Sequence, residues 1–251
     1  GVLSGTPANA NVGTSGNAVL ITVTDGNNGQ VTDSFTITVT NTNDAPTVAN
    51  AISDASTDED AAYSLSISNV FTDVDTGDSC TYSMSGAPST ITLSGTTISG
   101  MPVNADVGTH TIVVTCTDGS SASVSDSYVL TVANTNDAPT VASAIADAST
   151  AEDASYSLDV TSSFADVDTG DSLTYTMSGA PSTLSISSGT ISGTPLNADV
   201  GTHTIVVTAT DGSNAAVSDT FVLTVTNTND APTITSTADT SAEEDEAYSY
   251  T

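Results

Sequence analysis

Oxygen-bearing side chains recur along this chain in a fixed pattern. The stretch Asn-Thr-Asn-Asp-Ala-Pro occurs three times, starting at Asn41, Asn134 and Asn227, 93 residues apart. Loops of the form Asp-Val-Asp and single Asp-Gly turns recur at the same interval. Carboxylate and amide oxygens in such numbers are the ligands that a hard cation such as Ca²⁺ prefers in proteins.

The charge balance excludes several classes of partner. The chain has no Lys or Arg against 30 Asp and Glu, a formal net charge of −30. Nucleic acid is excluded as a direct partner and anionic membrane surfaces are disfavoured, because both require cationic side chains. No apolar run approaches the length of a membrane span. Two carboxylates 4 Å apart repel by about 4 kcal/mol at an effective dielectric near 20, so a packed cluster here must be solvated, protonated or metal-bound.

The 93-residue period predicts the domain organisation, because an immunoglobulin-like sandwich has about 100 residues. Two repeats are complete, 45–137 and 138–230. Residues 1–44 match the C-terminal part of a repeat, and residues 231–251 match its N-terminal strands. We call these segments repeats 1 to 4 in chain order.

Period-2 alternation of apolar and polar residues predicts an all-β fold of about seven short strands per repeat. The expected strands in repeat 2 are 48–52, 62–68, 80–84, 91–93, 96–98, 111–116 and 124–132. The segment from Phe71 to Asp78 is expected to be a loop. The fold class is therefore predicted as tandem antiparallel β-sandwiches, immunoglobulin-like, in an extended array.

The order of these motifs resembles that of cadherins. Asn-Thr-Asn-Asp-Ala-Pro is similar to the cadherin linker, the Asp-Val-Asp loops resemble its D-A-D motif, and Thr115-Cys-Thr-Asp118-Gly resembles its A-x-D-x-G. The combination of Phe-x-Asp-x-Asp, Leu-Thr-Tyr, Ile-Ser-Gly-Thr-Pro and Asp-Val-Gly is closer still to the dystroglycan-type cadherin-like repeats of large bacterial and archaeal surface proteins and adhesins. The linker begins with Asn rather than Asp and lacks the final Asn, which implies fewer ions at each junction than in cadherins.

The resemblance implies calcium at each junction between repeats. At the junction of repeats 2 and 3 the implied ligands are Glu59, Asp106, Asn136, Asp137, Asp166, Asp168 and Asp211. At the preceding junction they are Asn43, Asp44, Asp73, Asp75 and Asp118, with Asn11 in place of Asp106. At the last junction they are Glu152, Asp199, Asn229 and Asp230.

Other polar residues are interpreted as structural. Asp33, Asp126 and Asp219, placed just before the last strand of each repeat, and Asp78 and Asp171 are expected to be turn residues. His110 and His203 are expected to be surface or turn residues, because each repeat has a single histidine with no second one nearby.

The two cysteines, Cys80 and Cys116, both lie in repeat 2, where repeat 3 has Leu173 and Ala209. Both are expected on the inward side of neighbouring strands, where a large and a small residue occupy about the volume of two medium ones. The sequence predicts a disulfide in an oxidising compartment; two buried free thiols are the alternative.

No catalytic motif is recognised, and acidic pairs repeated in every repeat favour structure over an active site. The sequence therefore predicts a non-enzymatic, calcium-stiffened repeat region of an extracellular or cell-surface protein, such as an adhesin stalk acting in cell adhesion or biofilm. The alternative is a subunit of a self-assembling filament or surface layer, in which identical chains complete one another by strand addition.

Overall fold

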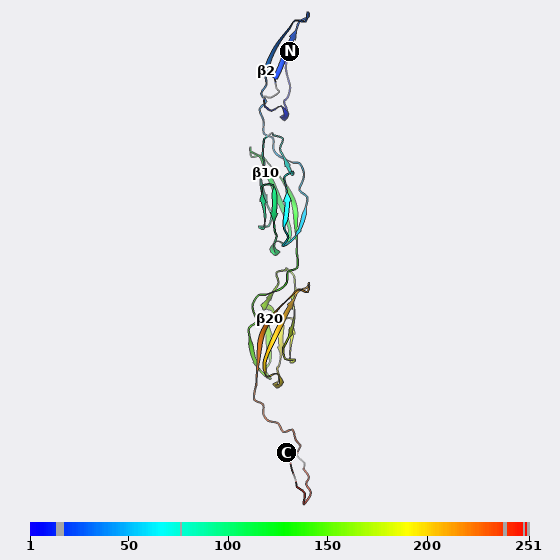
Figure 1. Cartoon of the computed structure of the whole chain (residues 1–251), viewed down its shortest axis with the longest axis vertical. Coiled ribbons are helices and arrows are strands. Elements are labelled where there is room, and N and C mark those ends of the chain that lie inside the picture. The colour runs from blue at the N-terminus through cyan, green and yellow to red at the C-terminus, as the bar shows by residue number, and fades with distance from the viewer. Residues whose placement is uncertain (14–17, 76, 238–239, 248, 250–251) are drawn as a thin grey trace. The chain divides into compact units, whose positions relative to one another are not determined.

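The computed structural model describes residues 1–13, 18–75, 77–237, 240–247 and 249, and divides the chain into two compact units, 1–135 and 136–251. Each unit contains one β-sandwich (Figure 1). The predicted all-β, immunoglobulin-like fold is confirmed. Among the described residues the only helices are single 3-10 turns, and none has the length or hydropathy of a membrane span.

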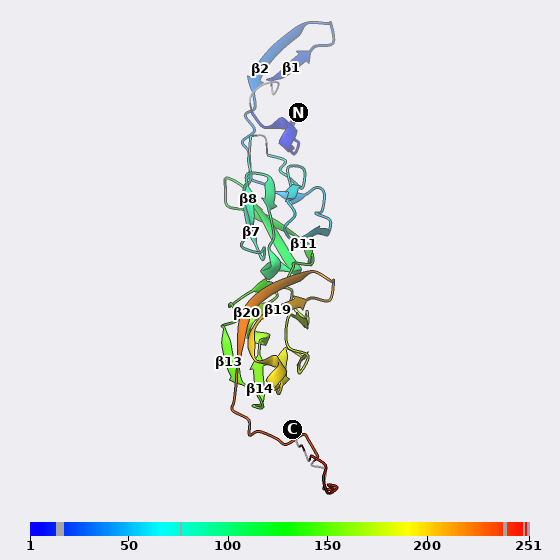
Figure 2. The ribbon, with the colours of Figure 1, turned by 60° about the horizontal axis from the view of Figure 1, so that its bottom comes forward.

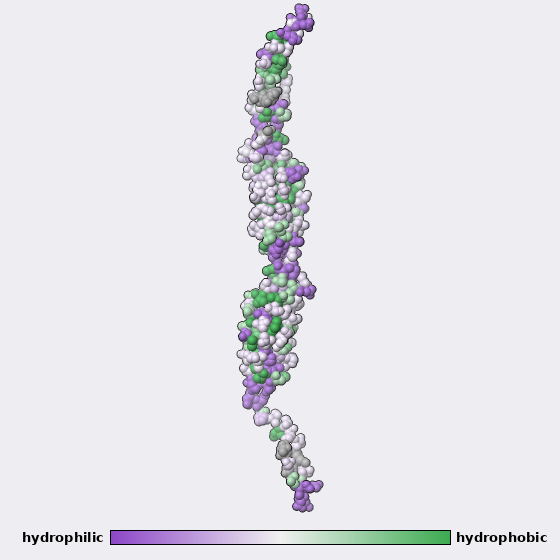
Figure 3. Space-filling model, in the orientation of Figure 1, coloured by the Kyte–Doolittle hydropathy of each residue, from purple (hydrophilic) through white to green (hydrophobic). Residues whose placement is uncertain are grey.

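The first unit begins with residues that correspond to the end of a repeat. The 3-10 turn η1 (Asn9–Asn11) precedes a hairpin of β1 (Ala18–Thr24) and β2 (Gln30–Thr36). Large apolar side chains of this hairpin are exposed, among them Leu20, Val23 and Val31. Hydrophobic residues accordingly appear on its surface in Figure 3.

Repeat 2 folds as two facing sheets in the same unit. One sheet has the order β4-β11-β10-β7, the other β5-β9-β8, and β3 pairs with β6. The strands are β3 (Thr47–Val48), β4 (Ala55–Asp58), β5 (Tyr63–Ser66), β6 (Phe71–Thr72), β7 (Thr81–Ser85), β8 (Ile91–Ser94), β9 (Thr97–Gly100), β10 (Gly108–Thr117) and β11 (Ser123–Ala133), with the 3-10 turn η2 (Asn104–Asp106) before β10.

Repeat 3 has the same topology in the second unit, with sheets β13-β20-β19-β16 and β14-β18-β17 and the pair β12-β15 (Figure 2). The elements are β12 (Thr140–Val141), β13 (Ala148–Ala151), β14 (Tyr156–Asp159), η3 (Thr161–Ser163), β15 (Phe164–Ala165), β16 (Thr174–Ser178), β17 (Leu184–Ser187), β18 (Thr190–Gly193), η4 (Asn197–Asp199), β19 (Gly201–Thr210) and β20 (Ala216–Thr226). None of the described residues after Thr226 belongs to a strand.

The two long strands at the centre of the four-stranded sheet, β10 and β11 in repeat 2 and β19 and β20 in repeat 3, bury one face because apolar residues alternate along them. Ile112 pairs with Tyr128, and both side chains are almost fully buried. Their neighbours Val114 and Leu130 are also buried in the same core. Burying side chains of this size stabilises a fold by about 1.5–3 kcal/mol each.

Two of the sequence expectations about strands are wrong in detail. The segment expected to be a loop from Phe71 begins with the two-residue strand β6, which pairs with β3. The strand β4 was not expected, because Ala-Ser-Thr-Asp carries little apolar signal. It pairs in parallel with β11, so each sandwich contains one parallel pair among its antiparallel ones.

Asp126 and Asp219 lie within β11 and β20, and Asp33 lies within β2, so the expectation that they precede the last strand in a turn is wrong. Asp126 Oδ2 accepts a hydrogen bond of 2.6 Å from the backbone N–H of Ile52, and Asp219 does the same for Ile145. These carboxylates therefore hold the segment between β3 and β4 in repeat 2 and the segment between β12 and β13 in repeat 3. Alternation alone does not reveal this role, because it assigns polar residues to the outer face.

Candidate metal centres

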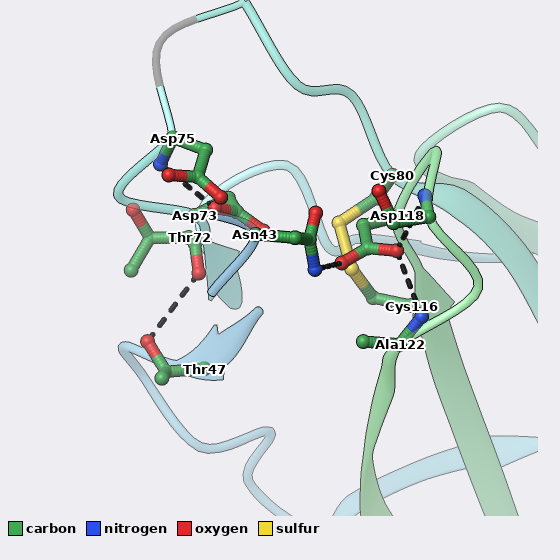
Figure 4. Close-up of a disulfide and its surroundings, with 10 residues drawn as sticks. Asn43, Thr47, Thr72, Asp73, Asp75, Cys80, Cys116, Asp118 and Ala122 are labelled. Atoms are coloured by element: carbon green, nitrogen blue, oxygen red, sulfur yellow. Dashed lines mark hydrogen bonds between the residues drawn. A yellow bond between two sulfur atoms is a disulfide. The ribbon is translucent and has the colours of Figure 1, made fainter. Parts of the chain in front are cut away.

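At the start of repeat 2 an acidic cluster gathers residues of the preceding linker and of the repeat itself, which we call head cluster 2: Asn43, Asp44, Asp73, Asp75 and Asp118. The linker after β2 supplies the first two, the loop after β6 the next two, and the β10–β11 turn the last. The backbone N–H of Asp44 donates to Asp75 Oδ2 over 2.7 Å. Asn43 Nδ2 donates to Asp118 Oδ2 over 2.9 Å, and Figure 4 shows the two side chains pointing toward each other.

Asp118 is held in place by its own turn. Its Oδ1 accepts hydrogen bonds from the backbone N–H groups of Ser120 and Ala122, at 2.9 and 2.8 Å. The hydrogen bond from Asn43 is the largest effect lowering the pKa of Asp118, and it outweighs the opposing effect of burial. These hydrogen bonds therefore stabilise the ionised form of the Asp118 carboxylate and fix its position.

Two oxygens of head cluster 2 have no hydrogen-bond partner. Asp73 Oδ2 and Asp75 Oδ1 are both buried and unpaired. Asp75 as a whole is only 5% exposed. A buried carboxylate oxygen without a donor costs free energy unless a positive charge compensates it, and this chain has no Lys or Arg to do so.

The linker before repeat 3 and repeat 3 itself build the same arrangement, head cluster 3, from Asn136, Asp137, Asp166, Asp168 and Asp211. Asn136 Nδ2 donates to Asp211 Oδ2 over 3.0 Å, and the N–H of Asp137 donates to Asp168 Oδ2 over 2.8 Å. The pKa of Asp211 is lowered, chiefly by the Asn136 amide. Asp166 Oδ2 is buried without a partner, like its equivalent in repeat 2.

A second acidic group lies at the other end of each sandwich and is centred on a buried glutamate. Glu59 is 2% exposed; its Oε1 accepts from the N–H of Thr135 over 2.9 Å, and its Oε2 is buried without a partner. Glu152 repeats this geometry, with Thr228 as donor at 2.7 Å and Oε2 again unpaired. We call Glu59 with Asp106, and Glu152 with Asp199, base groups 2 and 3.

The path of β11 separates the head cluster from the base group within repeat 2. Asp118 precedes the start of β11, whereas the N–H of Glu59 donates to the carbonyl of Ala133 at its end. At about 3.3 Å per residue, the eleven residues of β11 span roughly 33 Å. One repeat therefore carries acidic oxygens at both ends.

The carboxylates of Asp106 and Asp199 already accept hydrogen bonds from groups of their own repeat. Oδ2 of Asp106 accepts from Thr90 Oγ1 at 2.6 Å and from the N–H of Val103 at 3.1 Å. Asp199 makes the equivalent bonds to Thr183 at 2.7 Å and Leu196 at 2.9 Å. The pKa of Asp199 is lowered by these bonds, that from the Leu196 N–H first.

Asparagines that the sequence reasoning missed contact the linker aspartates. Asn9 Nδ2 donates to Asp44 Oδ2 over 3.0 Å, and Asn197 Nδ2 donates to Asp230 Oδ2 over 3.3 Å. Asn229, which the sequence predicts as a ligand, donates from Nδ2 to the backbone carbonyl of Asp230 over 3.2 Å. The repeated Asn-Ala-Asn or Asn-Ala-Asp before Val-Gly is the signal that could have identified Asn9 and Asn197.

The histidines lie beside the base groups. His110 Nε2 is 2.7 Å from the carbonyl oxygen of Asp106, and His203 Nε2 is 2.7 Å from that of Asp199. Both rings are partly buried, at the third position of β10 and β19. Each ring therefore contacts the 3-10 turn that carries the aspartate and helps to hold it in place.

The donor sets fit calcium. Every candidate ligand is a carboxylate or amide oxygen, and unpaired buried oxygens occur in the head clusters of both repeats and on the glutamate of each base group. Calcium takes six to eight such oxygens at about 2.3–2.6 Å in flexible geometry. Its charge would offset both the cost of burying these carboxylates and the repulsion between them.

Cys80 and Cys116 form a disulfide, with their Cα atoms 5.2 Å apart. Figure 4 shows it beside Asp118, two residues beyond Cys116. In repeat 3 the equivalent Ala209 is fully buried and Leu173 packs against the core. The bond therefore ties the loop before β7 to β10, next to head cluster 2.

Residues 45–133 and 138–226 each match the model of one domain family, described as "Putative Ig domain" (He_PIG). The chain belongs to this immunoglobulin-like family. No curated protein sequence matches it.

Among solved structures the He_PIG repeats resemble cadherin domains. Mouse cadherin-23 EC22-24 superposes with a TM-score of 0.54 at 20% identity, over 84% of this chain and 74% of that one. Human mucin-like protocadherin EC1-2 gives 0.53 at 18% identity, over 73% and 98%. The cadherin-like fold expected from the motifs is confirmed by these matches.

Another match is the endo-fucoidan hydrolase MfFcnA4 of glycoside hydrolase family 107, with a TM-score of 0.36 at 23% identity over 84% of this chain. The chain spans about a third of the length of that enzyme. Immunoglobulin-like and cadherin-like repeats are typically non-enzymatic.

Proposed function

We propose that this chain is a calcium-binding, calcium-rigidified structural region of an extracellular surface protein, such as the stalk of an adhesin. Calcium binds where consecutive repeats meet, held by the base group of one repeat, the linker, and the head cluster of the next. For repeats 2 and 3 the ligands are Glu59, Asp106, Asn136, Asp137, Asp166, Asp168 and Asp211.

One observation carries the proposal: equivalent carboxylate oxygens are buried and unpaired in both complete repeats. Glu59 Oε2 corresponds to Glu152 Oε2, and Asp73 Oδ2 to Asp166 Oδ2. The chain has no Lys or Arg, and neither histidine is hydrogen-bonded to any of these oxygens. A bound divalent cation removes the penalty at all four positions.

The same reasoning supports a mechanical role. Without cations, acidic ends of adjacent repeats repel and the linker is free to bend. With calcium bound, oxygens of both repeats and of the linker coordinate the same ions, which fixes the angle between the repeats. The disulfide and the cadherin-like, immunoglobulin-like fold support an extracellular location.

Thermal melting of the full chain in calcium, magnesium and chelator tests the proposal. A ligand at 100 times its Kd stabilises the folded state by about 2.7 kcal/mol, or on the order of 10 °C for a domain of this size. We expect calcium to raise the melting temperature of the wild-type chain by about this amount, and to raise that of Glu59→Gln by less. The control Glu243→Gln removes the same charge from an exposed residue outside both sandwiches. Equal melting in calcium and chelator would refute the proposal.

Assembly of identical chains into a filament or surface layer remains the alternative predicted from the sequence. Sedimentation of the full chain in calcium separates the two roles. A monomer across the micromolar range supports the stalk, and reversible end-to-end growth supports the filament.

A further inference from the structure

The Asp-Val-Asp-Thr-Gly-Asp loop brings a third carboxylate to each head cluster. In repeat 2, carboxylate oxygens of Asp73, Asp78 and Asp118 all lie within 4.8 Å of one another. In repeat 3 the same is true of the loop's own three aspartates, Asp166, Asp168 and Asp171. Asp78 and Asp171 are exposed, and the cadherin pattern does not account for them.

The position of this third aspartate is the same in both repeats. The loop folds back so that the N–H of Asp78 donates to the carbonyl of Asp75 over 3.3 Å, and Asp171 does the same to Asp168. A Cβ built on Gly119 would lie 3.8 Å from Asp78 Oδ1, and one built on Gly212 would lie 3.8 Å from Asp171 Oδ1. The third carboxylate therefore lies over the Asp-Gly turn that carries Asp118 or Asp211.

An independent observation points to a ligand at this place. Asp75 is 95% buried, and its Oδ1 has no hydrogen-bond partner. Asp73 Oδ2, inside the trio itself, is also buried and unpaired, as is Asp166 Oδ2 in repeat 3. The backbone N–H of Asp75 donates to Asp73 Oδ1 over 2.9 Å, so Asp75 is attached directly to the trio.

We propose that each complete repeat binds a calcium ion within itself, using Asp78 or Asp171 as a ligand together with the other aspartates of its Asp-Val-Asp-Thr-Gly-Asp loop and the Asp-Gly turn. All these oxygens come from one sandwich, so this ion needs no neighbouring repeat. The inference rests on the proposed function in that it shares the head cluster and the preference for calcium.

Calorimetric titration of the full chain with calcium tests this inference through the double variant Asp78→Asn, Asp171→Asn. Affinity at such sites depends on the number of ligand charges, so we expect two of the ions per chain to bind roughly tenfold more weakly or not at all. The matched control is Asp159→Ser, which removes one carboxylate and installs the residue that repeat 2 carries as Ser66. Binding by the double variant with the control's stoichiometry and affinities would overturn the inference.

A second measurement distinguishes a ligand from a turn residue. In chelator, the double variant removes repulsion from each loop, so it is expected to melt at or above the wild-type temperature. Melting several degrees lower would assign Asp78 and Asp171 a structural turn role and overturn the inference.

A separate variant, Glu59→Gln with Glu152→Gln, distinguishes this site from the junction sites. If it loses ions while the loop variant does not, the junction proposal stands and the inference fails. If only the loop variant loses ions, the inference stands and the junction proposal fails. If the wild-type chain binds no calcium, both fail.

Discussion

The side-chain amide of Asn136 donates a 3.0 Å hydrogen bond to Asp211, 75 residues further along the chain. Asn43 and Asp118 form the same pair in repeat 2, at 2.9 Å. The linker is thus attached to the β-turn of the sandwich that follows it, before any ion is considered. The pair also holds the pKa of each aspartate below its ordinary value.

Replacing Asn136 with Ala should raise the pKa of Asp211 toward its ordinary value, because the amide is the largest effect lowering it. The folded-state pKa lies below the unfolded one, near 4, so the stabilisation is complete above that value and is lost as the pH falls through the folded pKa. Carbon-detected NMR titration of the Asp211 carboxyl in chelator measures the shift. Asn229→Ala is the control, since its amide bonds a backbone carbonyl. An unchanged Asp211 pKa in Asn136→Ala would contradict the assignment.

Reduction of the disulfide should destabilise repeat 2 and leave repeat 3 unchanged, because repeat 3 has no cysteine. A bond that closes a loop with a sequence separation of 36 residues contributes about 4 kcal/mol on the chain-entropy model. Denaturant unfolding with and without reductant measures the loss.

The double variant Cys80→Leu, Cys116→Ala gives the matched comparison, because it installs the pair that repeat 3 uses. It should retain more stability than Cys80→Ala, Cys116→Ala, which leaves a cavity. Equal losses for the two double variants would show that packing at this position contributes little.

The two repeats differ at one buried hydroxyl pair, which gives a prediction about the core. In repeat 2 the hydroxyls of Tyr63 and Tyr128 are 3.3 Å apart and hydrogen-bonded. In repeat 3 the equivalent partner is Phe221, and the Tyr156 hydroxyl is buried without a partner. Tyr156→Phe should therefore be neutral or stabilising by about 1 kcal/mol, whereas Tyr63→Phe should destabilise by about 1 kcal/mol. Urea unfolding of both variants measures the change in the free energy of unfolding. If Tyr156→Phe loses as much stability as Tyr63→Phe, the prediction is contradicted.

The long strands were predictable because their alternation is strong, as in the buried Ile112, Val114 and Cys116 of β10. The strand β4 was not, because its residues are small and polar and it is placed by backbone pairing with β11. The role of Asp126 is not predictable from the sequence for a related reason: its carboxylate accepts from a backbone N–H, that of Ile52, which only the folded chain brings near.

The positions of the acidic residues could be read from the 93-residue period, whereas their hydrogen bonds could not. The roles of Asn9 and Asn197 depend on where a 3-10 turn points its amide. Asp78 and Asp171 resemble ordinary turn residues in sequence, and only the fold of the loop brings them over the Asp-Gly turn.

Small-angle X-ray scattering of the full chain in calcium and in chelator tests the central claim most directly, with Glu59→Gln, Glu152→Gln as the variant. If calcium joins consecutive repeats, the calcium profile fits one fixed arrangement of repeats 2 and 3, and chelation or the variant gives the profile of a flexible linker. Superimposable profiles of the wild-type chain in calcium and in chelator would contradict the claim.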